Sequence, residues 1–177
     1  VPLAPNIIQK EISMVTQERL KYLFSYNAET GHLIRKVSTS SNAIAGNRSG
    51  SLDNGTGYRR LRLDSKIYQE HRIIWLLVKG SFPPDYIDHI NGVKDDNRLC
   101  NLREATNAEN QYNQGNRSNN TSGFKGVSYH KRSGKYIANI TIHGHQKYLG
   151  LHETIKEAHN AYCAASLKYH KEFSRTN

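Results

Sequence analysis

The chain has 177 residues, of which 36% are hydrophobic, and it carries 25 Lys and Arg against 15 Asp and Glu, a formal net charge of +10. Its longest apolar run, residues 73–78, falls well short of the roughly 20 residues that cross a bilayer, and no basic segment followed by an apolar one marks a signal peptide. These properties exclude a membrane-spanning protein and favour an acidic polymer as partner, although an anionic surface or simple solubility would explain the charge equally well.

The chain begins with a segment that we set apart from the fold. Met14 is the single methionine, and the sequence after it reads like a natural start. We therefore expect residues 1–13 to be an extension or a cloning remnant.

The pattern of apolar and turn-forming residues predicts the next elements in order. These are a helix at 16–24, a turn at 27–31, a strand at 32–37, a loop at 38–56, a strand at 58–63, a turn at 64–65 and a helix at about 70–79 ended by Gly80. In the strand at 58–63, Leu61 and Leu63 are expected to face inward, together with Arg59. Two small buried thiols are expected at Cys100 and Cys163, because neither cysteine belongs to a Cys-x-x-Cys pair.

Residues 86–113 contain the densest chemistry. The pattern predicts a strand, a loop, a second strand and a helix, with Asp88 and His89 ending the first strand and a capping box at Thr106 opening the helix. Asn110 is expected one turn into that helix. A histidine can activate water near neutral pH, while a carboxylate and an amide oxygen can hold a hard cation such as Mg²⁺. The segment therefore offers the parts that phosphodiester hydrolysis requires.

The spacing of Asp88-His89, Asn101 and Asn110 resembles the HNH, or ββα-metal, nuclease motif in its phage and intron-homing branch. The resemblance implies that His89 is the general base, that Asn101 braces the loop that orients His89, and that Asp88 and Asn110 hold one divalent metal, Mg²⁺ or alternatively Mn²⁺. The competing interpretation is a surface turn among Asn-rich loops. His71 is expected to be a packed core residue, and residues 95–97 are expected to shape a turn.

A polar linker is expected at residues 114–123, and beyond it the pattern changes. Strands at 125–130 and 136–142, a hairpin turn at 143–145, a strand at 147–149 and a long helix opened by the capping box at Thr154 are predicted. Residues 115–177 carry 10 Lys and Arg against 3 Asp and Glu, a net of +7, whereas residues 14–114 carry 14 against 11, a net of +3. The basic excess therefore lies in the last third of the chain.

This last third resembles the DNA-binding domain of plant ethylene-response factors, the Apetala family, through Phe124-Lys125-Gly126-Val127, Tyr148-Leu149-Gly150 and the helix after Thr154. In that family a three-stranded antiparallel sheet enters the major groove. The positions that match its DNA contacts, with a hairpin-tip arginine added, are Lys125, Ser128, His130, Arg132, Tyr136, Asn139, Thr141, Lys147 and Tyr148. Ser128 stands where the family has arginine, and Tyr136 and Tyr148 where it has tryptophan, so the plant recognition sequence is not transferred. Tyr136 and Tyr148 could equally pack within the sheet, and residues 131–132 could equally be a solvated hairpin tip.

Together these features predict an α+β protein in which a small N-terminal α/β portion and a ββα-metal unit are followed by a three-stranded antiparallel sheet with one helix. The expected domains are a nuclease domain at 14–113 with its catalytic unit at 86–113, the linker at 114–123 and a DNA-binding domain at 124–177. The resemblance implies a metal-dependent endonuclease acting on double-stranded DNA, of the homing or phage nicking type, in the cytoplasm of a bacterial or phage-infected cell. We expect no membrane partner, no small-molecule cofactor, and a monomer or homodimer. A DNA-binding regulator with an inactive nuclease fold and an HNH restriction enzyme are the alternatives.

Overall fold

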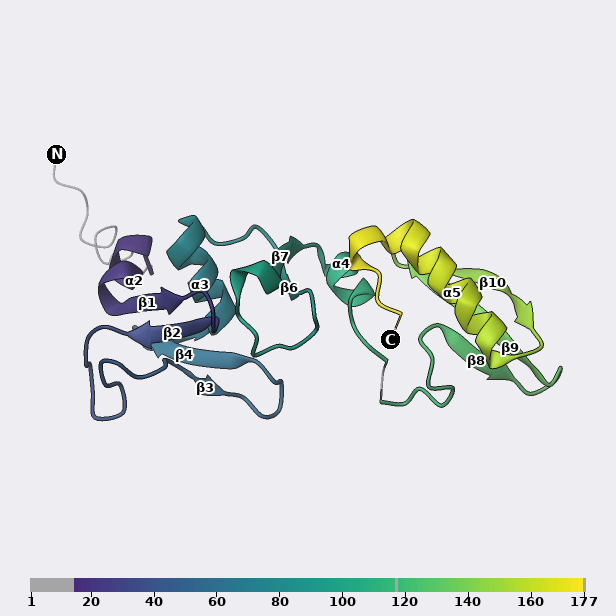
Figure 1. Ribbon diagram of the computed structural model, residues 1–177, viewed down its shortest axis with the longest axis horizontal. Coiled ribbons are helices and arrows are strands. Elements are labelled where there is room, and N and C mark those ends of the chain that lie inside the picture. The colour runs from purple at the N-terminus through teal and green to yellow at the C-terminus, as the bar shows by residue number, and fades with distance from the viewer. Residues whose placement is uncertain (1–14, 117, 177) are drawn as a thin grey trace. The chain divides into compact units, whose positions relative to one another are not determined.

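The computed structural model describes residues 15–116 and 118–176, and it divides into two compact units, residues 1–104 and 105–177. The expected extension at 1–13 lies outside the described residues. Both units mix helices with strands, as the α+β prediction requires (Figure 1). Over the described ranges, no helix is long and apolar enough to cross a membrane.

The first unit begins with a helix and a hairpin. Helix α2 (Gln17–Leu23) starts at Thr16, whose side chain accepts a hydrogen bond from the backbone N–H of Arg19. Strands β1 (Phe24–Asn27) and β2 (His32–Arg35) then pair antiparallel. The predicted helix ran one residue too far, because Phe24 has extended backbone angles and its buried ring opens β1.

A second, three-stranded antiparallel sheet consists of β3 (Ser51–Leu52), β4 (Arg59–Leu63) and β5 (Lys66–Gln69). The tight turn between β4 and β5 places Asp64 and Ser65 at positive φ. Leu61 and Leu63 are buried as predicted. The short strand β3 falls in the stretch predicted as loop; its two residues are both exposed, so no apolar pattern marks them.

Helix α3 (Glu70–Lys79) matches its predicted range and ends at Gly80, which adopts the left-handed conformation. The main core of the first unit lies between α2, α3, the first hairpin and β4. Its fully buried side chains include Leu20, Leu33, Ile73 and Ile74. Removing these side chains from water is the principal force that joins the segments.

The predicted order strand, loop, strand, helix is confirmed in the segment with the densest chemistry. It comprises β6 (Tyr86–His89), a 3₁₀ turn η1 (Leu99–Asn101), β7 (Leu102–Ala105) and α4 (Asn107–Tyr112). β6 and β7 form a two-stranded sheet. Trp75 of α3 packs together with Ile87 of β6 and Leu102 of β7. The capping box of Thr106 and Glu109 opens α4 as predicted.

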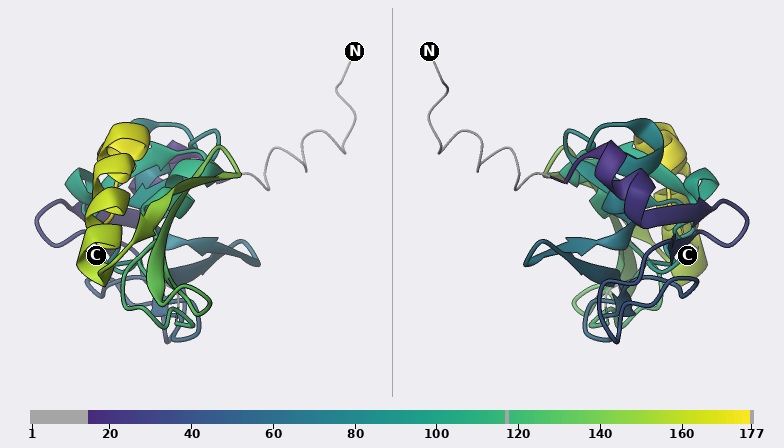
Figure 2. Two further views of the ribbon diagram at one scale, coloured as in Figure 1. Left: turned by 90° about the vertical axis from the view of Figure 1, so that its right-hand side faces the viewer. Right: turned by 90° about the vertical axis from the view of Figure 1, so that its left-hand side faces the viewer.

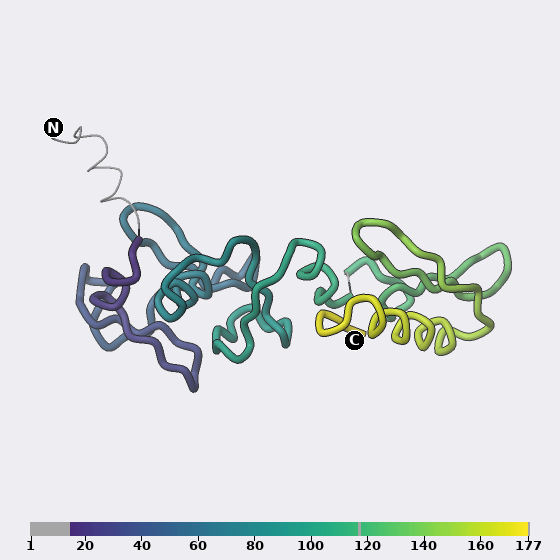
Figure 3. The backbone as a smooth tube through the Cα atoms, turned by 90° about the horizontal axis from the view of Figure 1, so that it is seen from above, coloured from purple at the N-terminus to yellow at the C-terminus, as the bar shows by residue number. Residues whose placement is uncertain are grey.

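The second unit contains a three-stranded antiparallel sheet in the order β10-β9-β8. Its elements are β8 (Val127–His130), β9 (Lys135–Ile142), β10 (His145–His152), α5 (Ile155–His170) and the 3₁₀ turn η2 (Lys171–Phe173). Helix α5 lies along one face of the sheet (Figure 2, left), and Figure 3 follows it from above. Its predicted stripe supplies Ala158, Tyr162 and Ala165 to the core against Ala138 and Ile140.

Gly126 permits a close approach between β8 and α5. It adopts a φ of +73°, and a Cβ there would lie 2.1 Å from the ring of Tyr162 and 2.5 Å from the carbonyl oxygen of Asn139. Only glycine satisfies both conditions, so the Gly-Val sequence at the start of β8 has a packing reason.

The expected boundaries and the two compact units do not coincide, because α4 belongs to the second unit. Tyr112 of α4 is buried with Phe173, and its ring stacks on His170 at a centroid distance of 3.8 Å. Within the expected linker, Asn120 and Ser122 hydrogen-bond to the carbonyl oxygen of Phe124.

The expectation of buried thiols is wrong for Cys100, which is exposed in the short η1 turn, and Cys163 is half-buried.

Candidate active site

The strand β6 ends in an acid and a histidine that are both buried. Asp88 and His89 are each only 4% exposed, although β6 begins at the exposed Tyr86. Titratable side chains are rarely buried without partners, because removal from water penalises the charged form. The partners of these two residues therefore define the site.

Asp88 is paired with Arg103 of β7. Arg103 approaches the Oδ2 atom of Asp88 with its Nε at 2.8 Å and its Nη2 at 2.7 Å. The guanidinium compensates the charge of the buried carboxylate and satisfies its hydrogen-bonding capacity at Oδ2.

One ring nitrogen of His89 contacts an asparagine side chain. Its Nε2 lies 2.9 Å from the Oδ1 atom of Asn97. The Nδ2 atom of Asn97 donates a hydrogen bond to the Oε2 atom of Glu70 at 2.8 Å. Because a carboxylate only accepts, Asn97 turns its amide nitrogen toward Glu70 and its oxygen toward His89. His89 therefore carries its hydrogen on Nε2 and its lone pair on Nδ1.

Aromatic rings surround His89. The rings of His71 and Tyr58 lie at centroid distances of 5.1 Å and 5.8 Å from it. Burial lowers the pKa of His89, so the imidazole is neutral at pH 7 and available as a base. His71 is buried as predicted, and burial with a contribution from His89 lowers its pKa to about 3.

Glu70, the first residue of α3, is completely buried between two arginines. Its Oε2 lies 3.6 Å from Arg48 and 3.7 Å from Arg59, and both arginines also contact the Oδ1 atom of Asp95, at 2.9 Å and 3.0 Å. Burial raises the pKa of Glu70 to about 7, and Arg48 and the hydrogen bond from Asn97 oppose this rise. Glu70 is therefore mainly a carboxylate only above pH 7, where it accepts the hydrogen bond from Asn97.

Asn101 spans the loop that follows His89. Its Oδ1 accepts the backbone N–H of Asn91 at 2.9 Å, and its Nδ2 donates to the carbonyl oxygen of Asp96 at 2.8 Å. Asp96 in turn binds Asn91 and Arg98 through its carboxylate, and the hydrogen bonds from Arg98 lower its pKa to about 2. These contacts are what a bracing role for Asn101 requires, and they give Asp96 a role in shaping the turn.

The first hairpin supports the same loop. The hydroxyl of Tyr26 donates to the carbonyl oxygen of Asn97 at 3.2 Å and accepts the N–H of Leu99 at 2.9 Å. Gly31 has a φ of +73°, and a Cβ there would lie 2.5 Å from the backbone nitrogen of Arg98. Residues 26–31 therefore fix the backbone that carries Asn97.

Asn110 is the fourth residue of α4 and lies in the second unit, whereas Asp88, His89 and Asn101 lie in the first. Within the second unit, α4 is anchored by Tyr112, whose hydroxyl accepts the backbone N–H of His143 at 2.7 Å. The assignment of Asn110 as a metal ligand stays a prediction.

The expected DNA-contacting residues divide between the two faces of the sheet. Asn139 and Thr141 alternate along β9 with the residues that pack on α5. Ser128 pairs opposite Ile137 and Tyr148 pairs opposite Asn139, so all four candidates lie on the face away from the helix. Tyr148 is 60% exposed on that face.

The remaining contact candidates are placed differently. Tyr136 packs against the α5 core, and the Nζ atom of Lys147 donates to the hydroxyl of Tyr169 of α5 at 2.8 Å. His130 contacts Ser133 at the hairpin tip, next to the exposed Arg132.

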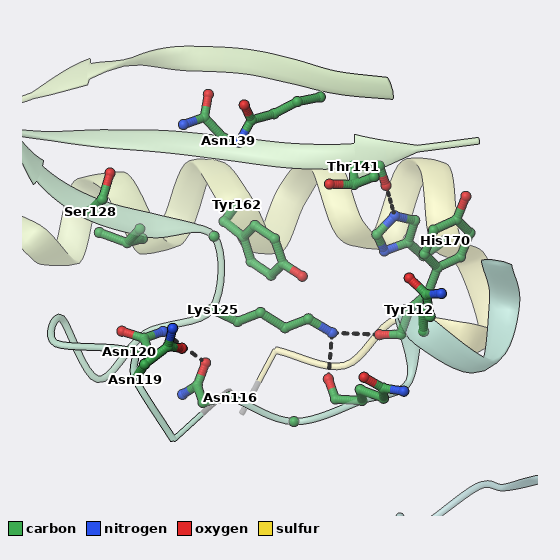
Figure 4. A pocket seen from close by; sticks show the side chains of 16 residues that line it. Tyr112, Asn116, Asn119, Asn120, Lys125, Ser128, Asn139, Thr141, Tyr162 and His170 are labelled. Carbon is green, nitrogen blue, oxygen red and sulfur yellow. Dashed lines mark hydrogen bonds between the residues drawn. The ribbon is translucent and has the colours of Figure 1, made fainter. Parts of the chain in front are cut away.

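Lys125 is half-buried beneath a pocket of about 500 Å³ in the second unit (Figure 4). Its Nζ atom donates to the carbonyl oxygens of Tyr112 and Gln114, both at 2.6 Å. Burial, with a contribution from Arg175, lowers its pKa to about 8. The described pocket lining also includes Ser128, Asn139 and Thr141 and contains no acidic side chain.

Comparison with known proteins finds a family match in the segment that runs from β5 to α4. Residues 68–112 match a family model, HNH_3, described as HNH endonuclease. Over 82 residues the chain is 37% identical to "Protein 3.8" of Escherichia phage T7, a match that covers 46% of this chain and 68% of that protein. The chain belongs to this phage protein family and carries an HNH endonuclease domain. No solved structure matches it. The resemblance of the second unit to the plant DNA-binding domain stays a prediction.

From the sequence, no role in the site was assigned to three residues that contact Asp88, His89 or Asn97. They are Glu70, Asn97 and Arg103. Asn97 was expected only to shape a turn, and Arg103 was given no role although it lies two residues after Asn101. Glu70 precedes the His71-Arg72 pair at the start of a helix, where an acid is commonplace, so no local signal marks it.

Proposed function

We propose that this protein is a divalent-metal-dependent endonuclease that hydrolyses phosphodiester bonds in duplex DNA, of the phage nicking or homing type. The observation that carries the proposal is the buried Asp88-His89 pair at the end of β6, inside the segment that matches the HNH endonuclease model. The Nε2 atom of His89 faces the oxygen of Asn97, so the basic lone pair of the neutral ring is on Nδ1.

His89 can perform general-base catalysis in this arrangement. Its Nδ1 atom takes a proton from water while the water oxygen forms a bond to phosphorus, and the bond from phosphorus to the leaving sugar oxygen breaks. Asn101 contributes by holding the loop after His89, since it bonds to both Asn91 and Asp96. A divalent cation, when bound, would offset the negative charge that develops on the phosphate and on the leaving oxygen.

The residues present fit a hard cation. Within residues 15–116 and 118–176, no group of three or more His, Cys, Asp and Glu side chains gathers as a metal site. Asp88 provides a carboxylate and Asn110 an amide oxygen, and Mg²⁺ or Mn²⁺ is commonly held by one or two such ligands with water and phosphate completing the set. We propose Asp88 and Asn110 as these ligands.

We further propose that the second unit binds the duplex through the sheet face away from α5. Residues 115–177 carry a net charge of +7, which favours the phosphate backbone. Ser128, Asn139, Thr141 and Tyr148 supply polar and aromatic groups on that face. Side chains of this kind can contact base edges in a major groove wide enough for a sheet.

Cleavage of supercoiled plasmid tests the proposal. Wild-type protein with Mg²⁺ is expected to convert a plasmid carrying cognate phage DNA to open circles or linear product, and a chelator is expected to abolish this. His89→Ala is expected to lose the activity, because the base is removed. His159→Ala is the matched control, since His159 lies on α5 in the second unit and is expected to leave cleavage intact.

The product distinguishes the alternatives. Open circles indicate nicking, whereas direct linearisation at a short palindrome indicates a restriction enzyme. Retained DNA binding with no cleavage by wild type, on plasmid that carries the phage DNA, contradicts the endonuclease and leaves a binding protein with an inactive nuclease fold.

A further inference from the structure

We propose that Glu70 and Asn97 act as a positioning pair that fixes the tautomer and orientation of His89. This inference rests on the proposed role of His89 as the base. It assigns a role to two buried residues outside the motif of Asp88, His89, Asn101 and Asn110.

The three side chains form one continuous hydrogen-bond chain. The Oε2 atom of Glu70 accepts from Asn97 at 2.8 Å, and the Oδ1 atom of Asn97 lies 2.9 Å from the Nε2 atom of His89. Their exposed fractions are 0% for Glu70, 1% for Asn97 and 4% for His89. All three lie in the first unit.

The direction of the chain is set at Glu70. A side-chain amide can present either its oxygen or its nitrogen to a neighbour, and a histidine can carry its hydrogen on either ring nitrogen. A carboxylate has no such freedom, so above pH 7, where Glu70 is mainly ionised, it turns the Asn97 amide one way and selects the Nε2–H form of His89. The other form would place the hydrogen on Nδ1 and remove the basic lone pair from that atom.

The surrounding structure keeps this chain in place. Arg48 and Arg59 flank Glu70. Both arginines also form an ion pair with the Oδ1 atom of Asp95, at 2.9 Å and 3.0 Å. Tyr26 holds the carbonyl oxygen of Asn97. A fully buried carboxylate is costly to maintain, and its Oε1 atom has no hydrogen-bond partner among the described residues. An acid at this position compensates Arg48 and Arg59 and also sets the orientation of Asn97.

The tautomer of His89 can be read directly by NMR of protein labelled with ¹⁵N-histidine. At pH 8, wild type is expected to show Nε2 as the protonated nitrogen and Nδ1 as the unprotonated one. Glu70→Gln is expected to shift both signals toward intermediate values, because the introduced amide can donate to Asn97 and allow it to flip. Asp95→Asn is the matched control: it alters the same arginine cluster, leaves the carboxylate at Glu70, and is expected to leave the His89 signals unchanged.

A second variant separates positioning from simple loss of folding. Combining Glu70→Gln with Asn97→Asp moves the carboxylate one step closer to His89, so the introduced aspartate accepts from Nε2 and the introduced glutamine donates behind it. This double variant is expected to recover the wild-type tautomer. In plasmid cleavage, Glu70→Gln is expected to lower kcat by roughly 10- to 100-fold with little change in KM, and the double variant to recover much of it.

Two results would overturn the inference. One is a wild-type His89 that carries its hydrogen on Nδ1. The other is a folded Glu70→Gln protein whose His89 signals match those of wild type. Because the NMR measurement needs no cleavage, an inactive wild type would contradict the proposed function while the hydrogen-bond chain could still be confirmed or rejected.

Discussion

Arg103 contacts a single oxygen of Asp88 with two of its nitrogens, Nε at 2.8 Å and Nη2 at 2.7 Å. The two side chains are 17% and 5% exposed, so water screens the pair only weakly. The guanidinium thus compensates the carboxylate at the buried end of β6. If Asp88 binds a cation as proposed, this pair also limits how many of its lone pairs remain for the metal.

Replacing Arg103 by methionine should be costly, because it leaves Asp88 buried without its compensating charge. Arg103→Met is expected to lower the free energy of unfolding by about 3 kcal/mol. Urea unfolding can follow this through Trp75, the single tryptophan, which is buried beside β6 and β7. Arg19→Met is the control, since the Arg19–Asp64 pair is exposed and should contribute no more than about 1 kcal/mol. Equal losses for the two variants would contradict the prediction.

His71 should make the first unit sensitive to acid. Its pKa is about 3 in the folded protein and near 6.5 when unfolded, so the unfolded state binds the proton first as the pH falls. The stability associated with neutral His71 is therefore present above pH 6.5 and is lost progressively between about pH 6.5 and pH 3. His71→Phe keeps a ring in place and removes this titration.

The measurement is an acid titration monitored by the fluorescence of Trp75. The unfolding midpoint of His71→Phe is expected at lower pH than that of wild type. His145→Phe, at an exposed position on β10, is the control and should leave the midpoint in place. An unchanged midpoint for His71→Phe would show that His71 does not govern the acid transition.

Local patterns predicted elements well where the signal was itself local. Helix α3 was placed correctly because a concentrated apolar segment ends at a glycine that adopts a left-handed conformation. The same holds for the capping boxes at Thr106 and Thr154, each of which joins residues three apart. Strand β3 was missed because its residues are exposed and its pairing partners lie seven and nine positions away.

The candidate site was predicted only in part, for a related reason. Asp88, His89 and Asn101 were singled out by their spacing, and the structure gives each a specific set of contacts. Glu70 meets Asn97 across 27 positions in the chain, so no period or turn signal reveals the pair. Asn97 was interpreted as a turn residue because asparagine favours turns, yet its side chain is buried and faces His89.

Lys125 and Arg132 should affect the second unit in different ways. Lys125 donates to two carbonyl oxygens, so its ammonium group is committed within the protein, whereas Arg132 is exposed at the β8–β9 tip. Arg132→Ala is expected to weaken DNA binding and reduce the slope of log K against log salt by about 1. Lys125→Ala is expected mainly to lower the melting temperature, because a buried acceptor pair loses its donor.

Fluorescence anisotropy with duplex DNA at several salt concentrations gives the slopes, and calorimetry gives the melting temperatures. If Lys125→Ala reduces the salt slope and leaves the melting temperature unchanged, Lys125 is a phosphate contact after all. If affinity for DNA is indifferent to salt in wild type, the electrostatic account of this unit is wrong.

Asn110 provides the sharpest test of the proposed metal ligands. Asn110→Ala removes the amide oxygen from α4 while alanine favours the helix, so folding should be preserved. Mn²⁺ binding, measured from the signal of the free ion by electron paramagnetic resonance, is expected to weaken by about 10-fold or more, by analogy with the loss of other metal-site groups.

Asn110→Asp retains an oxygen donor and should bind Mn²⁺ at least as well as wild type, and Asn107→Ala, at an exposed position of the same helix, should change nothing. DNA affinity should be similar in all four proteins, because the sheet face that we propose to bind the duplex is untouched. If Asn110→Ala binds Mn²⁺ and cleaves DNA as well as wild type does, Asn110 is not a metal ligand. A different second ligand beside Asp88 would then be required.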